Sequence, residues 1–184
     1  MVGTVVLERL VGVVLAIGPP VLFVLFYADG LIVGKLLQPA AVFVAFVGIT
    51  HPSWPILIGV SVGCIVAATA GQWTLYRGCN PDAPEYIGLR RKVQLVGEFP
   101  DRVIEHAGER QMAIVERGFD RFGTVGICAL NLIPGIRGLS AIPAGLSGFP
   151  RSRFVVAATL GNAGYVTLLG TAGLGLVRVI GIVS

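Results

Sequence analysis

The sequence predicts an all-α integral membrane protein, built as a single domain over residues 1–184. Hydrophobic residues make up 54% of the chain and charged residues 13%, whereas a soluble domain carries about 25% charged residues. Several apolar stretches reach the roughly 20 residues that a helix needs to cross a bilayer, and two others are broken by proline and polar residues. We therefore predict about three transmembrane helices, two oppositely oriented re-entrant hairpins and one amphipathic helix on the membrane surface.

The first transmembrane helix is expected over residues 5–27. Pro19 and Pro20 interrupt this stretch, and they should kink the helix or divide it into an interfacial and a spanning piece. The stretch lacks the basic start and the small-residue cleavage site of a signal peptide, so we expect it to be retained. Residues 28–30, Ala-Asp-Gly, have the composition of a turn, because aspartate and glycine both tolerate the backbone conformations of a helix end.

A first re-entrant hairpin is expected over residues 31–50, which are apolar but broken by Gly34, Lys35 and the pair Gln38-Pro39. Proline removes a backbone donor, and broken backbone at membrane depth is tolerated only where protein buries it or where it lines a wet cavity. A segment that enters and leaves on one face meets this condition. Lys35 would bring a positive charge into the hairpin, although a lysine that snorkels to the interface explains it equally well.

The second transmembrane helix is expected over residues 54–76, which are apolar and end with interfacial aromatic residues. Residues 77–123 form the one hydrophilic block, and the number of its lysines and arginines places it in the cytoplasm. Over residues 101–122, apolar and charged side chains follow near-helical spacing, which predicts an amphipathic helix on the membrane surface. A helix packed on the protein itself fits that pattern as well.

The second hairpin is expected over residues 124–150, and a third transmembrane helix over residues 153–183. Prolines and glycines are dense in this hairpin, and Arg137 lies near its tip. A charge at membrane depth is costly and usually marks the path of an ion or a substrate; the alternative is an arginine that snorkels from a helix end. We expect Asn162 in the last helix, together with Asn131, to satisfy the broken backbone of the hairpin.

With the hydrophilic block in the cytoplasm, the two hairpins enter the membrane from opposite faces and can meet near its midplane. Interrupted segments in corresponding halves of a membrane protein indicate an inverted repeat with a transport site between its halves. We therefore expect a site between residues 31–50 and residues 124–150 that is open to alternating access.

The second hairpin also carries a recognisable signature. Its segments IPGIR (133–137) and IPAG (142–145), followed by RF (153–154), resemble a signature of the DedA family, whose members share the VTT (SNARE-associated) domain. Where the family has its first arginine this chain has Asn131, which keeps hydrogen bonding and loses the charge. The resemblance implies the fold with two oppositely oriented hairpins and a role in moving lipids across the membrane, as a flippase or scramblase.

The resemblance implies an isoprenoid lipid phosphate or a phospholipid as the substrate. A guanidinium can hold a phosphate oxygen with its planar fork, and helix ends at broken tips can present free amides to an anion. The acidic pair to which the family's proton coupling is ascribed has no clear match, so Asp29 is the nearest substitute, with a structural cap as its alternative role. The expected substrate-binding residues are Arg137, Asn131, Pro134, Gly135, Ser140, Gly145 and Lys35.

Other classes of function fit the sequence less well. Residues 145–148 match the Gly-x-Ser-Gly of rhomboid-type proteases, but no histidine follows His106, and a serine without a base is a weak nucleophile. Cys64, Cys79 and Cys128 do not have metal-ligand spacing. We therefore expect no enzyme, no metal and no cofactor. The alternatives that stay open are an ion- or proton-coupled small-solute transporter and a membrane assembly protein without transport.

The expected location is the plasma membrane, which the chain would cross several times. Its partners would be a membrane lipid and, where transport is coupled, a proton or another cation. No basic stretch interleaved with aromatic residues argues for nucleic acid. Homo-oligomers are compatible with the sequence.

Overall fold

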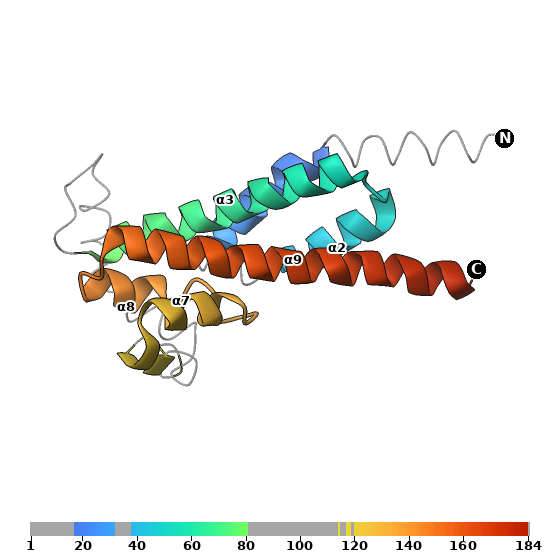
Figure 1. The fold of residues 1–184 in the computed structure, drawn as a ribbon. Coiled ribbons are helices and arrows are strands. Elements are labelled where there is room, and N and C mark those ends of the chain that lie inside the picture. Colours follow the sequence, from blue (N-terminus) through green and yellow to red (C-terminus); the bar gives the residue numbers. More distant parts are fainter. Residues whose placement is uncertain (1–16, 32–37, 81–113, 115–116, 119, 184) are drawn as a thin grey trace.

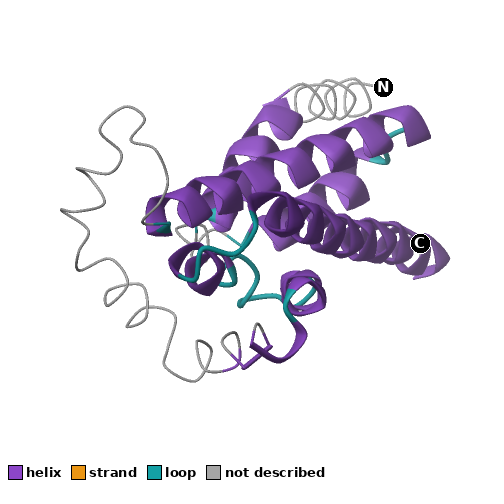
Figure 2. Ribbon diagram, turned by 60° about the vertical axis from the view of Figure 1, so that its left-hand side comes forward, coloured by secondary structure: helices purple, strands orange, loops and turns teal. Residues whose placement is uncertain are grey.

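The computed structural model of the protein describes residues 17–31, 38–80, 114, 117–118 and 120–183, with side chains in the last helix as far as residue 175. All regular structure in these residues is helical (Figure 2), which confirms the all-α prediction for this part of the chain. The start of the first predicted helix, Lys35 and most of the hydrophilic block lie outside the described residues. Of the predicted amphipathic helix over residues 101–122, the structure describes residues 114, 117–118 and 120–122, which are helical. In chain order, the helices are Ile17–Gly30, α2 (Pro39–Thr50), α3 (Trp54–Cys79), α7 (Thr124–Asn131), α8 (Ala141–Leu146) and α9 (Arg151–Val183).

Prolines mark where three of these helices begin. Pro39 opens α2, Pro55 lies in the first turn of α3, and Pro150 directly precedes α9. Proline is favoured in a first turn because its missing N–H has no partner there anyway and its fixed φ already suits a helix. The carbonyl of Pro150 accepts the first hydrogen bond of α9, from Phe154 N at 3.0 Å. These three prolines therefore mark helix starts, whereas Pro19 and Pro20 lie within the Ile17–Gly30 helix.

The bundle is arranged along α9, which has 33 residues and packs against α2, α3 and α7 (Figure 1). The short helix α8 packs against α3. Two apolar cores fill the bundle. One lies where α7 and α8 meet the end of α3 and the start of α9, and it includes Tyr76, Ile142 and Phe154. The other lies where the Ile17–Gly30 helix and α2 pack against the first half of α3 and the middle of α9, and it includes Phe26 and Phe43.

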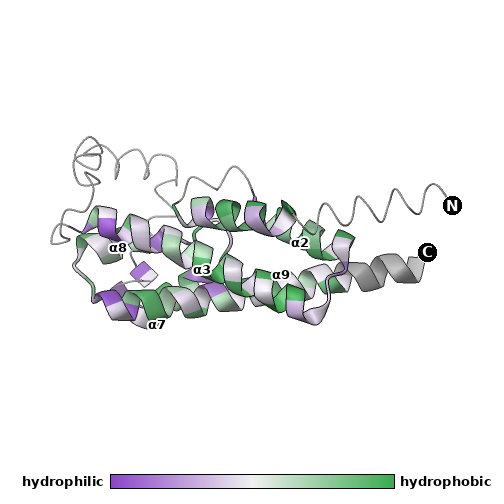
Figure 3. Ribbon diagram, turned by 90° about the horizontal axis from the view of Figure 1, so that it is seen from above, coloured by the Kyte–Doolittle hydropathy of each residue, from purple (hydrophilic) through white to green (hydrophobic). Residues whose placement is uncertain are grey.

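The outer surface of the bundle is also apolar. Ile58, Val62 and Val66 are exposed at four-residue intervals on α3, and Val156, Leu160 and Leu168 are exposed on α9. Hydrophobic residues recur along both helices (Figure 3). Trp54–Cys79 and Arg151–Gly175 are each long and apolar enough to cross a membrane. Large contiguous apolar surfaces of this kind are typical of proteins that contact lipid.

The predicted turn at residues 28–30 is wrong. The helix that begins in the described residues at Ile17 continues through Gly30, and the turn falls on Leu31, whose N–H donates to the carbonyls of Tyr27 and Ala28 at 3.1 Å. Gly30 serves close packing instead, because a Cβ there would collide with the backbone of α3 at Ala68 and Gln72. In the sequence, a glycine that forms a turn and a glycine that allows close packing look the same.

The remaining predicted segments correspond to elements as follows. Residues 54–76 fall within α3, residues 153–183 fall within α9, and the second half of the first predicted hairpin is α2. Residues 124–150 comprise α7, a turn over residues 132–140 and α8. That both broken segments re-enter the membrane remains a prediction.

Tyr76 joins the connection between α8 and α9 to α3. Its ring stacks between those of Trp73 and Phe154, with centroids 5.4 and 4.6 Å away. Its hydroxyl donates to the carbonyl of Phe149 at 2.5 Å and accepts from Asn80 Nδ2 at 3.3 Å. The contacts with Phe149 and Phe154 bind the start of α9 and the residues before it to the end of α3.

We expect Tyr76→Phe to lower the free energy of unfolding by about 1–3 kcal/mol, because the partly buried Phe149 carbonyl and the buried Asn80 amide both lose a hydrogen bond to the same hydroxyl. Thermal unfolding in detergent measures the effect. Tyr27→Phe is the matched control, since the Tyr27 hydroxyl meets Thr74 Oγ1 at 3.2 Å at an exposed position and its loss should cost less than about 0.5 kcal/mol. Equal melting temperatures for Tyr76→Phe and Tyr27→Phe would contradict the prediction.

Candidate functional site: a buried polar layer

A layer of polar side chains separates the two apolar cores. Along α3 the second core ends at Ala68 and the first begins at Leu75, and along α9 the first ends at Ala158 and the second begins at Tyr165. Between these limits the buried polar side chains are Gln72 on α3 and Asn162 on α9, and Thr69 on α3 is partly buried. The polar layer consists of Asp29, Thr69, Gln72, Asn131, Arg137 and Asn162, contributed by the Ile17–Gly30 helix, α3, α7, the turn over residues 132–140 and α9.

Arg137 lies at the centre of this layer and is only 4% exposed. Its Nε lies 3.1 Å from Asp29 Oδ2, and its Nη2 donates to Asn162 Oδ1 at 3.2 Å. The guanidinium carbon lies 4.1 Å from the centre of the Tyr165 ring and 5.4 Å from that of Phe26. A buried charge needs such pairing, because the desolvation of an isolated ion costs several kcal/mol. The guanidinium is thus held by one carboxylate, one amide and two aromatic faces.

The guanidinium still has hydrogen-bonding capacity. Its Nη1 is buried and has no hydrogen-bond partner among the residues that the structure describes, and the same is true of the Ser140 hydroxyl three positions along. Buried donors are nearly always satisfied in folded proteins, and an exception calls for a water, an ion or a ligand. Arg137 Nη1 can therefore donate to an anionic oxygen in addition to the contacts that hold the guanidinium.

The turn over residues 132–140 brings Arg137 into the layer. After α7 ends at Asn131, the chain reverses through Gly135 and Gly138, which have φ angles of 84° and 86°. These left-handed conformations favour glycine, because other residues are strained there. A Cβ on Gly138 would also approach the carbonyls of Asp29 and Gly30 at about 3.5 Å, so the turn lies directly against the end of the Ile17–Gly30 helix.

Three amide side chains connect the turn to the helices. Asn131 Oδ1 accepts from Gln72 Nε2 at 2.7 Å and from the backbone N–H of Gly138 at 3.3 Å, while its Nδ2 donates to the carbonyl of Ile127 at 3.0 Å. Asn162 Nδ2 donates to Gln72 Oε1 at 3.3 Å and to Thr69 Oγ1 at 3.0 Å. Asn131 therefore bonds to the backbone of the broken segment, as expected, whereas the bond that Asn162 makes to this segment goes to the Arg137 side chain.

The residues that the sequence singled out fall into three places. Arg137 and Asn131 belong to the polar layer, and Ser140 is buried in the same turn. Pro134 and Gly135 lie on the exposed side of that turn. Gly145 does not belong to the layer. It lets α8 approach the end of α3, because a Cβ there would lie 2.6 Å from the carbonyl oxygen of Tyr76. Lys35 is outside the described residues.

Asp29 is brought to Arg137 by the helix that precedes it. It is 9% exposed and forms the ion pair with Arg137 Nε at the end of the Ile17–Gly30 helix. Asp29 is not a turn residue, because the helix continues through Gly30 and buries Asp29 against the turn of residues 132–140. The candidate for proton coupling and the candidate for phosphate binding are direct partners.

Sequence reasoning missed four residues of the site. Gln72 and Thr69 interrupt an otherwise apolar helix, and a strongly polar amide in the middle of a spanning segment is a signal that could have identified Gln72. Phe26 and Tyr165 carried no such signal, since aromatic residues in apolar helices usually serve packing. They became part of the site only through their contacts with Arg137.

Comparison with known proteins gives one match. The family model described as the VTT domain matches residues 38–175, which is most of the chain and includes α2, α3, α7, α8 and α9 as far as Gly175. Asp29 precedes the matched residues, whereas every other member of the polar layer lies within them. Neither the curated proteins nor the solved structures include a significant match.

Proposed function

Because the chain belongs to the VTT-domain (DedA, SNARE-associated) family of membrane proteins, we propose that it moves a lipid across the bilayer and binds the head-group phosphate with Arg137. The substrate would be an isoprenoid lipid phosphate or a phospholipid, and the membrane would be the plasma membrane. The apolar outer faces of α3 and α9 support a position within lipid.

The observation that carries this proposal is the buried guanidinium with a spare donor. Arg137 lies between two apolar cores, where a charge that served stability alone could be replaced by apolar side chains at little cost. Its Nη1 has no hydrogen-bond partner among the described residues, and the planar guanidinium matches the oxygens of a phosphate. A phosphate-bearing head group would use this donor.

Asp29 gives the proposed site a link to protons. The carboxylate occupies one side of the guanidinium, 3.1 Å from Nε, and an anionic head group would compete with it there. Protonation of Asp29 would remove that competition, because a neutral carboxyl group attracts the guanidinium far less. Inward movement of a proton could in this way be coupled to binding of the lipid.

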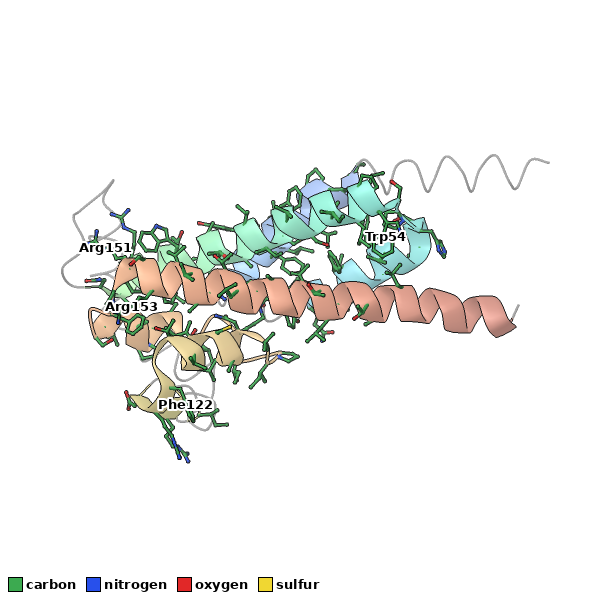
Figure 4. The ribbon with its side chains drawn as sticks, in the orientation of Figure 1. Trp54, Phe122, Arg151 and Arg153 are labelled. Atoms are coloured by element: carbon green, nitrogen blue, oxygen red, sulfur yellow. The ribbon has the colours of Figure 1, made fainter. Side chains whose placement is uncertain are left out.

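The ends of the bundle support an orientation. Arg151 and Arg153 are exposed at the start of α9, at the opposite end of the bundle from Trp54, which is 69% exposed at the start of α3 (Figure 4). Arg77 in the last turn of α3 adds a third basic residue beside the predicted loop of residues 77–123. We propose that this basic end faces the cytoplasm, where basic residues accumulate, and that the two broken segments enter from opposite faces.

The proposal is tested by lipid movement in proteoliposomes, with a fluorescent phospholipid and an isoprenoid phosphate as separate substrates. We expect Arg137→Ala to lower the rate at least about 100-fold, and Arg137→Lys to lower it about tenfold, since lysine keeps the charge and loses the fork. Arg151→Ala, which removes an exposed arginine of the same protein, should leave the rate within about twofold.

Each variant is first compared with wild type by size-exclusion chromatography and thermal unfolding, so that loss of transport is separated from loss of fold. An imposed pH gradient should change the rate of the wild type and not that of Asp29→Asn. Failure of well-folded wild type to move either lipid would overturn the proposal and favour a small-solute transporter or an assembly protein.

A further inference from the structure

The polar layer closes into a ring of hydrogen bonds around Arg137. From the guanidinium, the ring runs through Asn162 on α9, Gln72 on α3 and Asn131 on α7. It returns to the backbone N–H of Gly138, which adjoins Arg137 in the chain. The side chain and the backbone of one turn are therefore connected through three helices.

The direction of every bond in this ring is determined by chemistry. Arginine can only donate, so Asn162 must present its oxygen to Nη2 and its Nδ2 to Gln72. Gln72 must then present Oε1 to Asn162 and Nε2 to Asn131. At the far end, the carbonyl of Ile127 can only accept, and it takes Asn131 Nδ2. Reversal of any one amide would bring donor against donor and acceptor against acceptor.

Gln72 lies far from the turn in the sequence. It nevertheless bonds to both amide side chains that contact the turn, those of Asn131 and Asn162. Its two amide atoms bind Asn162 at 3.3 Å and Asn131 at 2.7 Å, and its side chain is fully buried. Without it, Asn162 would lose one of the two acceptors that direct its oxygen towards Arg137, and Asn131 would lose a donor beside Gly138. We infer that Gln72 is a positioning residue, which holds the turn of residues 132–140 and the guanidinium of Arg137 in the orientation that binds substrate.

This inference rests on the proposed function for its effect on transport, but its structural part stands on the ring alone. Two readouts therefore test it. Hydrogen–deuterium exchange over residues 132–140 reports whether the turn opens more often, and lipid movement in proteoliposomes reports whether Arg137 is still oriented. The first readout does not require that the protein transports a lipid.

The main variant is Gln72→Met, which keeps the length of the side chain and removes both hydrogen bonds of the amide. We expect exchange of the turn to become about 10- to 100-fold faster, as the loss of partners for buried groups implies, and lipid movement to fall about tenfold or more. Gln72→Asn keeps the amide and shortens it by one methylene, so it supplies a milder variant should Gln72→Met not fold.

Thr69→Val is the matched control. Thr69 lies on the same helix and also accepts a hydrogen bond from Asn162 Nδ2, but it is a branch outside the ring. Its replacement should change exchange of the turn by less than about threefold. A general weakening of the contact between α3 and α9 would change exchange of the turn by a similar factor in Gln72→Met and Thr69→Val.

A double-mutant cycle separates positioning from general stability. If Gln72 acts through Arg137, Gln72→Met should reduce transport in the wild type and have no further effect in the Arg137→Ala background. Additive losses, or a turn that exchanges at the wild-type rate in Gln72→Met, would overturn the inference. If wild-type protein moves no lipid, but the turn exchanges faster in Gln72→Met as expected, the proposed function is contradicted and the positioning of the turn by Gln72 is still supported.

Discussion

Replacement of Asp29 by alanine is expected to lower the free energy of unfolding by about 3–5 kcal/mol, because it would leave the buried guanidinium of Arg137 without its carboxylate. Both groups are nearly inaccessible to water, so solvent cannot take the place of the lost partner. Thermal unfolding in detergent, followed by circular dichroism, measures the effect as a lower melting temperature.

A second replacement shows whether the unpaired charge is the cause. In the double variant Asp29→Ala, Arg137→Leu, most of the lost stability should return, since an apolar pair of similar volume is often as stable as a buried ion pair. Asp120→Ala, which removes an exposed carboxylate from the described residues, should change stability by less than about 0.5 kcal/mol. If Asp29→Ala and Asp120→Ala have the same melting temperature, the ion pair does not stabilise the fold.

Replacement of Gly71 by alanine is expected to destabilise the protein by about 1–3 kcal/mol through overpacking. Gly71 lies where α3 crosses the Ile17–Gly30 helix, and a Cβ there would collide with the carbonyl of Tyr27 and come within 3.0 Å of Gly30 Cα. Both obstacles are backbone atoms, which cannot turn aside as a flexible side chain can.

Gly59→Ala is the control for this substitution, because Gly59 lies on the same helix and a Cβ there would meet no atom of the described residues within 4 Å. Alanine favours a helix more than glycine does, so Gly59→Ala should be neutral or stabilise by up to about 1 kcal/mol. Since Asp29 adjoins Gly30, separation of the two helices should also move the carboxylate away from Arg137 and reduce transport. Equal stability of Gly71→Ala and Gly59→Ala would show that the crossing is not tightly packed.

The sequence identifies Arg137 because its signals are local. A charge, two prolines and several glycines fall close together within apolar sequence, and each of these can be recognised without knowledge of the fold. The ring around it depends on contacts between distant positions, such as Gln72 with Asn131, which are 59 residues apart. The burial of Asp29 likewise follows from the docking of one helix against a turn, for which the sequence Ala-Asp-Gly carries no signal.

Glycine shows the limit of such reasoning most directly. Gly30, Gly135 and Gly145 look alike in the sequence, which predicts a turn or a binding site for all three. The structure gives Gly30 and Gly145 close contacts with α3, and it gives Gly135 a left-handed backbone conformation. At these three positions the neighbouring atoms or the backbone angle that disfavour a side chain are known only from the fold.

The length of α9 relates the protein to the thickness of its membrane. At 1.5 Å per residue, its 33 residues extend about 50 Å, whereas the hydrocarbon region of a typical bilayer measures about 30 Å. A helix with this excess must tilt, project into water or gather thicker lipid around itself. Because the polar layer depends on the alignment of α9 with α3, bilayers of different acyl-chain length should act on the orientation of Arg137 through hydrophobic mismatch.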